Sequence, residues 1–336
     1  MSRALHVAVV GATGLVGRTM LSILEERSFS SGRIVPVASA RSRGRRLTIR
    51  GEQVTVEVLE EFDFAGIDIA LFSPGGTVSG EYAPKAAASG CIVIDNTSRF
   101  RYDDDVPLVV PEVNGHAIAE CRQRNIIANP NCSTIQMVMA LQPIYANVGI
   151  ARINVATYQA VSGAGQSALA QLAHQAEAVV AGRRPEESVP LAFNAVPQID
   201  VFQDNGYTRE EMKMVWETRK ILGDERIAVN PTAVRVPVHY GHSEAIHLET
   251  LEPAEIEQVR DWLRVAPGVE LIDDRAGDFP TAWSHAAGRD PVYVGRVRRD
   301  LTHPRGIDMW VVSDNVRKGA ALNSVQIAEV LADSYW

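Results

Sequence analysis

Short apolar runs alternate with amphipathic stretches through the first 130 residues of the chain. The apolar runs are rich in β-branched residues, and the stretches between them have helical spacing. This alternation is typical of a parallel sheet covered by helices, so it predicts a doubly wound α/β domain. The predicted strands are Leu5–Val10, Ile34–Ala38, Ile67–Phe72, Cys91–Asp95 and Ile126–Ala128, and the predicted helices are Leu15–Glu26 and Ser79–Ala88.

The pattern changes after Asn129, where the strands become longer and follow one another without helices between them. Strands that meet directly indicate a largely antiparallel sheet, and the helices would then cover one face of it. We therefore predict a second domain of the α+β class. Its predicted strands are Arg152–Ala160, Val234–Val238, His242–Glu249, Val292–Arg298 and Met309–Ser313, and its predicted helices are Ser133–Val148, Ala168–Ala181, Arg209–Leu222 and Pro253–Val265.

The last predicted helix, Gly319–Asp333, is amphipathic, and we expect it to pack against the first domain. A chain of 336 residues is long enough for two domains that each bury a core. The predicted domains are therefore residues 1–130 together with 319–336, and residues 131–318.

Composition narrows the class of protein. The chain has 41 acidic residues against 33 lysines and arginines, a net charge of −8, and 46% hydrophobic residues. An acidic surface disfavours binding to nucleic acid or to an anionic membrane, because both need a broad positive field. No apolar run approaches the roughly 20 residues that span a bilayer. We therefore predict a soluble protein that binds neither nucleic acid nor membrane.

The three cysteines, Cys91, Cys121 and Cys132, have neither the even number nor the spacing of a disulfide framework or a zinc site. This favours a reducing cytoplasm and predicts no bound metal. The chain runs from Met1 to His6 directly into an apolar strand, without the long apolar core of a signal peptide. We therefore expect an unprocessed N-terminus.

A glycine-rich turn, Gly11-Ala12-Thr13-Gly14-Leu15-Val16-Gly17, follows the first predicted strand and opens the first helix. Glycines let the backbone turn tightly and approach a pyrophosphate, whose charge is stabilised by the helix N-terminus. The Gly-x-x-Gly-x-x-Gly spacing is a variant of the usual fingerprint. The sequence therefore predicts a Rossmann-like domain that binds a dinucleotide, although such a turn can also be simple strand-to-helix punctuation.

The end of the second predicted strand bears on which dinucleotide is bound. Folds that prefer NAD usually place a carboxylate there, to hold the ribose 2′-hydroxyl. The segment Val37–Ser42 contains no carboxylate but does contain Ser39 and Arg41, which can bind a 2′-phosphate. We therefore predict NADP. The alternative is that Arg41 belongs to a solvated basic loop with Arg43 and its neighbours.

Cys132 is a candidate nucleophile because it lies where a predicted strand ends and the next helix begins. A helix N-terminus stabilises a thiolate, and its N–H groups can also hold an oxyanion. Cys91 and Cys121 lie in a strand and in a polar helix and are expected to be structural. A single cysteine is often only a small buried apolar residue, so position alone leaves that alternative open.

A thiol nucleophile needs a base, and His242 follows Gly241 in a polar segment that returns to a strand. His239 in the same segment remains a competitor. Gln159 lies at the end of another strand, before the glycine-rich turn Ser162–Gly165. Its carboxamide would orient a carbonyl group or tie down the loop.

Together these segments resemble the aspartate-β-semialdehyde dehydrogenase family, over nearly the whole chain. We expect the chain to be most similar to the Gram-positive-like bacterial branch. The segments are GATGLVG (11–17), ASARSRG (38–44), DNTSRFR (95–101), PLVVPEVN (107–114), NPNCSTIQM (129–137), YQAVSGAG (158–165), FNAVPQIDVF (193–202), EEMKMVWETRKI (210–221), VRVPV (234–238), GHSEA (241–245), MWVVSDNVRKGAA (309–321) and NSVQIAE (323–329).

The resemblance implies reversible, NADP-dependent conversion of β-aspartyl phosphate to aspartate semialdehyde and phosphate. This reaction lies on the biosynthetic route to lysine, threonine, methionine and diaminopimelate. The resemblance also implies that residues 1–130 and 319–336 bind the cofactor, that residues 131–318 carry catalysis and dimerisation, and that the protein is a homodimer or a dimer of dimers. The region 168–193 is shorter than in many relatives, which leaves the contacts between subunits open.

Residue roles follow from the same resemblance. Cys132 matches the nucleophile, His242 the acid–base residue and Gln159 the amide that positions the thiohemiacetal. Arg101 and Lys213 match the phosphate-binding pair. The remaining substrate-binding matches are Glu210, Arg235 and Asn131, and the implied cofactor contacts are Gly11, Thr13, Gly14, Leu15, Val16, Gly17, Ser39, Arg41, Ser42, Ser162, Gly163 and Gln326. Without the family register, each charged residue here would be read as an ordinary surface charge.

Two alternatives remain. One is a related acyl-phosphate reductase of the N-acetyl-γ-glutamyl-phosphate type, which the Glu210 and Lys213 spacing and Arg235 argue against. The other is a catalytically silent paralogue, which the presence of Cys132 and His242 together with Gln159 argues against.

Overall fold

The computed structural model describes residues 4–27, 31–273, 277 and 279–335, and it divides into two compact units. The first unit contains the chain up to Asn131 and again from Ala320 onward, and the second runs from Cys132 to Gly319. The predicted start at Met1 and the last residue of the predicted first domain, Trp336, lie outside the described residues.

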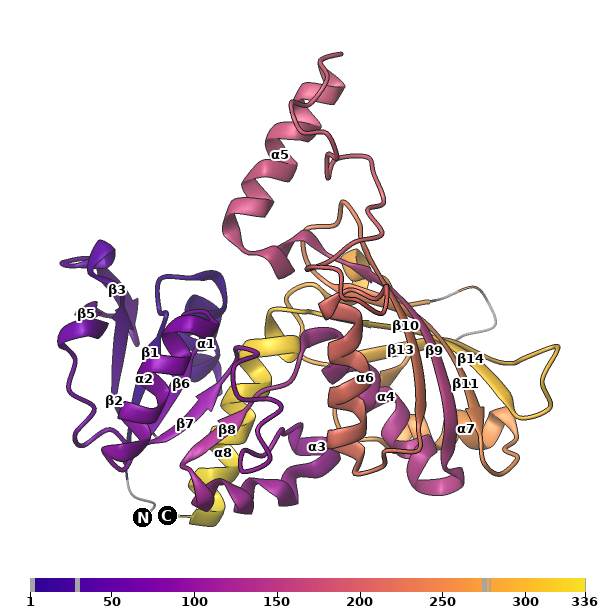
Figure 1. Ribbon diagram of the computed structural model, residues 1–336, viewed down its shortest axis with the longest axis horizontal. Coiled ribbons are helices and arrows are strands. Elements are labelled where there is room, and N and C mark those ends of the chain that lie inside the picture. The colour runs from indigo at the N-terminus through magenta and orange to yellow at the C-terminus, as the bar shows by residue number, and fades with distance from the viewer. Residues whose placement is uncertain (1–3, 28–30, 274–276, 278, 336) are drawn as a thin grey trace. The chain divides into compact units, whose positions relative to one another are not determined.

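A six-stranded sheet forms the centre of the first unit, with the strand order β5-β2-β1-β6-β7-β8 and every pairing parallel (Figure 1). All four residues of β6 are buried, as expected for a strand covered on both faces. The doubly wound domain is therefore confirmed. The strands are β1 (Leu5–Val10), β2 (Ser31–Ala38), β5 (Glu57–Val58), β6 (Ile69–Phe72), β7 (Ile92–Asp95) and β8 (Ile126–Ala128).

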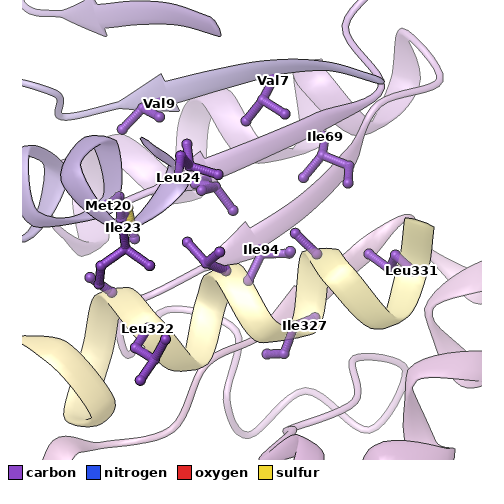
Figure 2. Close-up of a cluster of buried hydrophobic side chains, with 14 of the residues drawn as sticks. Val7, Val9, Met20, Ile23, Leu24, Ile69, Ile94, Leu322, Ile327 and Leu331 are labelled. Carbon is purple, nitrogen blue, oxygen red and sulfur yellow. The ribbon is translucent and has the colours of Figure 1, made fainter. Parts of the chain in front are cut away.

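The C-terminal helix α8 (Leu322–Tyr335) belongs to the core of this unit. Its Leu322 and Leu331 lie in one buried cluster with Val7 of β1 and Ile94 of β7 (Figure 2). The apolar side of this helix is buried in the core, which explains the amphipathic pattern of its sequence. The other helical segments of the unit are α1 (Leu15–Glu26), η1 (Ala40–Ser42), η2 (Leu59–Glu61), α2 (Gly76–Ala88), α3 (Pro111–Asn114) and η3 (Gly115–Gln123).

A hairpin in the first unit was not predicted from the sequence, which offered a basic loop around Arg41 and Arg43 only as an alternative. Strand β3 (Arg46–Ile49) pairs antiparallel with β4 (Glu52–Thr55), and the turn uses positive φ angles of 52° at Arg50 and 79° at Gly51. Most residues of the two strands are at least partly exposed. With no fully buried face, the hairpin has no strong hydrophobic alternation that would reveal it.

The second unit contains a six-stranded sheet with the order β10-β9-β11-β14-β13-β12. Its three central pairings are antiparallel, and the two edge strands are parallel to their neighbours. The prediction of a largely antiparallel sheet is confirmed. The strands are β9 (Ile150–Gln159), β10 (Ala228–Arg235), β11 (His242–Thr250), β12 (Val269–Leu271), β13 (Val292–Arg299) and β14 (Gly306–Ser313).

The predicted strand Val234–Val238 is placed too late in the sequence, because β10 begins at Ala228 and ends at Arg235. The segment contains Pro231, which usually interrupts a strand. Here β10 is an edge strand that pairs with β9 on one side. An edge strand tolerates proline, because the missing N–H leaves no ladder bond unmade on the open side.

Three helices of this unit pack on the sheet or on one another: α4 (Cys132–Val148), α6 (Arg209–Leu222) and α7 (Ile256–Val265). Helix α4 crosses the central strands, including β11 and β14. Helix α5 (Gln166–Val180) stands away from this layer within the unit (Figure 1). Shorter segments are η4 (Val161–Ala164), η5 (Ala282–Ala286) and the turn η6 (Arg317–Ala321), which precedes α8. Within the described ranges, no helix is both long and apolar enough to cross a membrane.

Candidate active site

Helix α4 begins at Cys132, so the sulfur lies at the positive end of the helix dipole. Cys132 is partly exposed, whereas Cys91 and Cys121 are buried. Burial raises the pKa of both buried thiols, more strongly for Cys91. Cys132 is therefore the cysteine with the accessibility and the helix position that a nucleophile needs.

Gly319 packs directly against Cys132. A Cβ atom added at Gly319 would lie 2.8 Å from the Cβ of Cys132, which is closer than real Cβ contacts allow. Glycine is therefore needed for η6 to approach the first residue of α4. Gly319 was not predicted as a site residue, although the run of small residues Gly319-Ala320-Ala321 is typical of a segment that approaches another closely.

His242 is the first residue of β11 and is fully buried. Its Nδ1 accepts a hydrogen bond of 2.9 Å from the main-chain N–H of Ala160. In the neutral ring the proton is then on Nε2, which lies 3.4 Å from Nε2 of Gln159. Burial, with a smaller effect from Arg235, lowers the pKa of His242 to about 3. The competing His239 is exposed.

Gln159 connects His242 to an ion-pair network on α6. Its Nε2 donates to Oε1 of Glu210 over 3.1 Å, and its Oε1 accepts from the hydroxyl of Thr157 over 3.0 Å. Two partners on opposite ends of the amide fix its orientation. The carboxamide is therefore held beside the imidazole.

Glu210 and Lys213 lie one turn apart on α6 and form an ion pair of 2.8 Å. Lys213 also pairs with Asp200 at 3.0 Å. Burial alone would lower the pKa of Lys213, but attraction to Glu210 and Asp200 outweighs it and raises the pKa. Lys213 therefore stays charged. Asp200 was not selected from the sequence, because a single aspartate in a loop carries no pattern.

Arg235 ends β10, and its Nη1 donates to the main-chain oxygen of Ala160 over 2.6 Å. Burial lowers the pKa of its guanidinium, and attraction to Cys132 and Glu210 opposes that shift. A Cβ at Gly163 would lie 3.1 Å from Nη1 of Arg235 and 3.3 Å from Cε1 of His242. A glycine at position 163 therefore leaves room between two of the predicted site residues.

The second unit thus contains Cys132, Gln159, Glu210, Lys213, Arg235 and His242, and the last five are connected through shared contacts. Two other predicted substrate residues, Arg101 and Asn131, are buried in the first unit. Nη2 of Arg101 donates to the main-chain oxygen of Asn96 over 2.9 Å. The roles of these residues in binding remain predictions.

The glycine-rich turn has the close packing that a dinucleotide loop requires. Gly11 has φ 88°, and a Cβ there would lie 2.9 Å from the main chain of Ser73. A Cβ at Gly17 would lie 2.2 Å from the oxygen of Gly11. Gly14 lies directly before α1, and Leu15 and Val16 are the first two residues of that helix. The side-chain-free surface of this turn therefore fits a cofactor pyrophosphate.

The other predicted cofactor residues lie in both units. Next to the glycine turn, the hydroxyls of Thr13 and Ser42 lie 3.3 Å apart, and Ser39 and Arg41 are exposed in the same segment. In the second unit, the Ser162 hydroxyl donates to the side chain of Asn315 over 3.1 Å, next to Gly163. Gln326 of α8 donates to Glu112 over 2.8 Å. Their contacts with a cofactor remain predictions.

Two family models match the chain. Residues 6–121 match "Semialdehyde dehydrogenase, NAD binding domain", and residues 141–318 match "Semialdehyde dehydrogenase, dimerisation domain". The solved structure "aspartate semialdehyde dehydrogenase II complexed with ASA" from Vibrio cholerae is similar with a TM-score of 0.98 and 57% identity, and all of both chains is covered.

Relatives of known name are similar along their full length, and they correct one expectation. An "Aspartate-semialdehyde dehydrogenase" from Shewanella violacea is 60% identical, with both chains covered completely. The Bacillus subtilis protein of the same name is 49% identical, over 98% of each chain. The expected similarity to a Gram-positive-like branch is therefore not supported. With matching domains, matching fold and this identity, the chain belongs to the aspartate-semialdehyde dehydrogenase family.

Proposed function

We propose that the protein is an NADP-dependent, phosphorylating aspartate-semialdehyde dehydrogenase. It reversibly converts β-aspartyl phosphate to aspartate semialdehyde on the route to lysine, threonine, methionine and diaminopimelate. The observation that carries this proposal is the position of Cys132 at the start of α4, in the same compact unit as the His242–Gln159–Glu210 network. Similarity to named relatives along the full chain supports the choice of substrate.

Cys132 acts as the nucleophile. In the biosynthetic direction its thiolate attacks the carbonyl carbon of the acyl phosphate, a C–S bond forms, and the C–O bond to phosphate breaks. The product is a thioester on Cys132 and inorganic phosphate. A covalent intermediate divides one difficult step into two easier ones. Helix α4 favours the thiolate and the oxyanion that forms at the attacked carbonyl.

His242 holds a proton beside the reacting oxygen. Because its Nδ1 is engaged by the N–H of Ala160, Nε2 is the ring atom that exchanges the proton. When bound, NADPH supplies the hydride that reduces the thioester to a thiohemiacetal. The thiohemiacetal then collapses: its hydroxyl proton returns to Nε2 of His242, the C–S bond breaks, the aldehyde leaves and the Cys132 thiolate is restored. Gln159 keeps the carbonyl oriented during this step.

The charges on α6 suit the substrate's own charges. Glu210, Lys213 and Asp200 carry a net charge of −1, which favours the substrate ammonium at Glu210. The phosphate is assigned to Lys213 together with Arg101. Arg235, with a planar guanidinium, binds the substrate carboxylate, and Asn131 is also assigned to substrate binding.

The cofactor is NADP. The turn after β2 offers Ser39, Arg41 and Ser42 to a 2′-phosphate, and the hydroxyl of Ser42 lies 3.3 Å from that of Thr13 in the glycine-rich turn. These groups supply hydrogen-bond donors and a positive charge where an NAD-preferring fold has a carboxylate. The first unit would thus bind the cofactor, and the second would carry the catalytic residues.

The assembly is a homodimer or a dimer of dimers. Within the second unit, α4 covers one face of the sheet. The other face has apolar side chains such as Trp310, next to Tyr158, which is 38% exposed. The match of this unit to a dimerisation domain supports its role in subunit association.

The test is a phosphate-dependent assay with aspartate semialdehyde, run in parallel with NADP and NAD. We expect reduction of NADP that requires phosphate, with much slower reduction of NAD. N-acetylglutamate semialdehyde is the comparison substrate. Phosphate-dependent reduction with N-acetylglutamate semialdehyde but not with aspartate semialdehyde would contradict the proposal, and so would inactivity with both.

A further inference from the structure

A buried carboxyl group lies close to the proposed catalytic residues and has no part in the reaction described above. Glu244 follows His242 by two residues in β11, so the two side chains point to the same face of the sheet. Glu244 is 0% exposed. Neither of its carboxyl oxygens has a hydrogen-bond partner in the described part of the chain.

Gln136 is a polar residue of α4, the helix that covers this face of the sheet. It lies one turn after Cys132 on α4, which packs against β11. Gln136 is 1% exposed, and neither polar atom of its amide has a hydrogen-bond partner among the described residues. Gln136 thus lies four residues after Cys132 on α4, and Glu244 lies two residues after His242 on β11. The two side chains are a second polar pair next to the proposed catalytic pair.

The charges around Glu244 favour its neutral form. Burial raises its pKa well above the ordinary value, and the Gln136 amide opposes this only in part. The residues next to it in the sheet are Thr157 of β9 and Val311 of β14, which pair with it, and His242, which precedes it by two residues in β11. None of these is a cation at neutral pH, because the pKa of His242 is about 3.

A neutral carboxylic acid complements a carboxamide. The acid has one O–H donor and one carbonyl acceptor, and the amide offers an acceptor and N–H donors. Two hydrogen bonds between them would satisfy both groups. Leaving all four polar atoms unpaired would be costly in an apolar interior.

We propose that Glu244, as a neutral acid paired with the amide of Gln136, is a positioning residue that holds the first turn of α4 against the start of β11. The pairing thereby fixes Cys132 relative to His242. This inference rests on the proposed roles of those two residues.

The neutral form matters because an anion at this position would repel the Cys132 thiolate and raise the pKa of the thiol. Glutamine at position 244 keeps the size and the hydrogen-bonding capacity of the neutral acid. Leucine keeps most of the volume but removes the polar pairing. The two substitutions therefore separate positioning from charge and from simple packing.

The experiment compares E244Q and E244L with the unmodified enzyme, and E249Q is the control on the opposite face of β11. Three properties are measured: kcat and KM for aspartate semialdehyde, the pH profile of Cys132 alkylation by iodoacetamide, and the unfolding temperature. We expect E244Q and E249Q to keep kcat within about twofold, with the alkylation profile unchanged. We expect E244L to fold but to lose about tenfold or more in kcat with little change in KM.

Two results would overturn the inference. One is an E244L enzyme with unchanged kcat. The other is an E244Q enzyme whose alkylation profile moves to lower pH, because that shift would reveal an anion at Glu244. If E244L does not fold, Q136L decides in the same way: a comparable loss of kcat supports the pairing, and unchanged kcat refutes it. Failure of the proposed function is distinguishable, because the unmodified enzyme would then lack phosphate-dependent NADP reduction.

Discussion

The imidazole of His242 and the main chain of Ala160 are joined by a hydrogen bond of 2.9 Å in which Nδ1 is the acceptor. A protonated ring would place a proton on Nδ1 as well and would lose this bond. The bond and the complete burial of the ring therefore act in the same direction, and both favour neutral imidazole.

This preference predicts a specific dependence of stability on pH. The pKa of His242 is about 3 in the folded protein and about 6.5 in the unfolded chain. Between these values the unfolded state binds more protons, so the free energy of unfolding falls as pH falls from 6.5 toward 3. We expect His242 to contribute a slope of up to about 1.4 kcal/mol per pH unit in this window.

The measurement is urea unfolding of the unmodified protein and of His242→Asn at several pH values between 7 and 4. We expect the two proteins to differ in slope by up to one proton in the acidic part of this range. The difference in slope should vanish above pH 7, where the histidine is neutral in both states. Equal slopes throughout would show that His242 is not held neutral.

Gly319→Ala tests the close packing of η6 against the proposed nucleophile. The added methyl group would lie 2.8 Å from the Cβ of Cys132, so the first turn of α4 must shift. Because a displacement of this kind misaligns the sulfur, we expect kcat to fall by about tenfold or more. Gly115→Ala is the matched control, since a Cβ there meets no atom within 4 Å. Equal kcat values for both variants would show that the packing does not position Cys132.

Arg41→Ser tests the choice of cofactor. Loss of a charged hydrogen bond to a 2′-phosphate is worth about 1.5–3 kcal/mol, so kcat/KM for NADP should fall about 10-fold to 100-fold. The value for NAD should change little. Arg43→Ser is the control, because Arg43 forms an ion pair with Glu61. If the Arg43 variant loses as much activity with NADP, the assignment to Arg41 is wrong.

The sequence reveals elements whose residues are buried in a regular pattern. Strands such as Leu5–Val10 and helices such as Arg209–Leu222 were predicted with the observed bounds, because both carry strong hydrophobic patterns. The hairpin from Arg46 to Thr55 was missed because most of it is exposed. Pro231 concealed the edge strand β10, since the sequence does not show which strand will lie at an edge.

Prediction of the site residues from the sequence has the same limit. Cys132 and His242 stand out because a strand end, a helix start or a glycine accompanies them. The Ala160 N–H, Asp200, Gly319 and Glu244 do not, because their importance arises from neighbours that are distant in sequence. Glu244 even fits the sequence pattern of an ordinary strand residue. Its unpaired burial becomes visible only when β11 and α4 are placed against each other.

The central claim is that Cys132 carries a covalent thioester, and a pre-steady-state measurement tests it most directly. Aspartate semialdehyde and NADP are mixed with the enzyme in the absence of phosphate, and NADPH formation is followed by absorbance. We expect a burst close to one NADPH per active site, then near arrest until phosphate is added, and no burst with Cys132→Ala of unchanged fold. Phosphate-independent steady turnover, or a burst that survives in Cys132→Ala, would contradict the account.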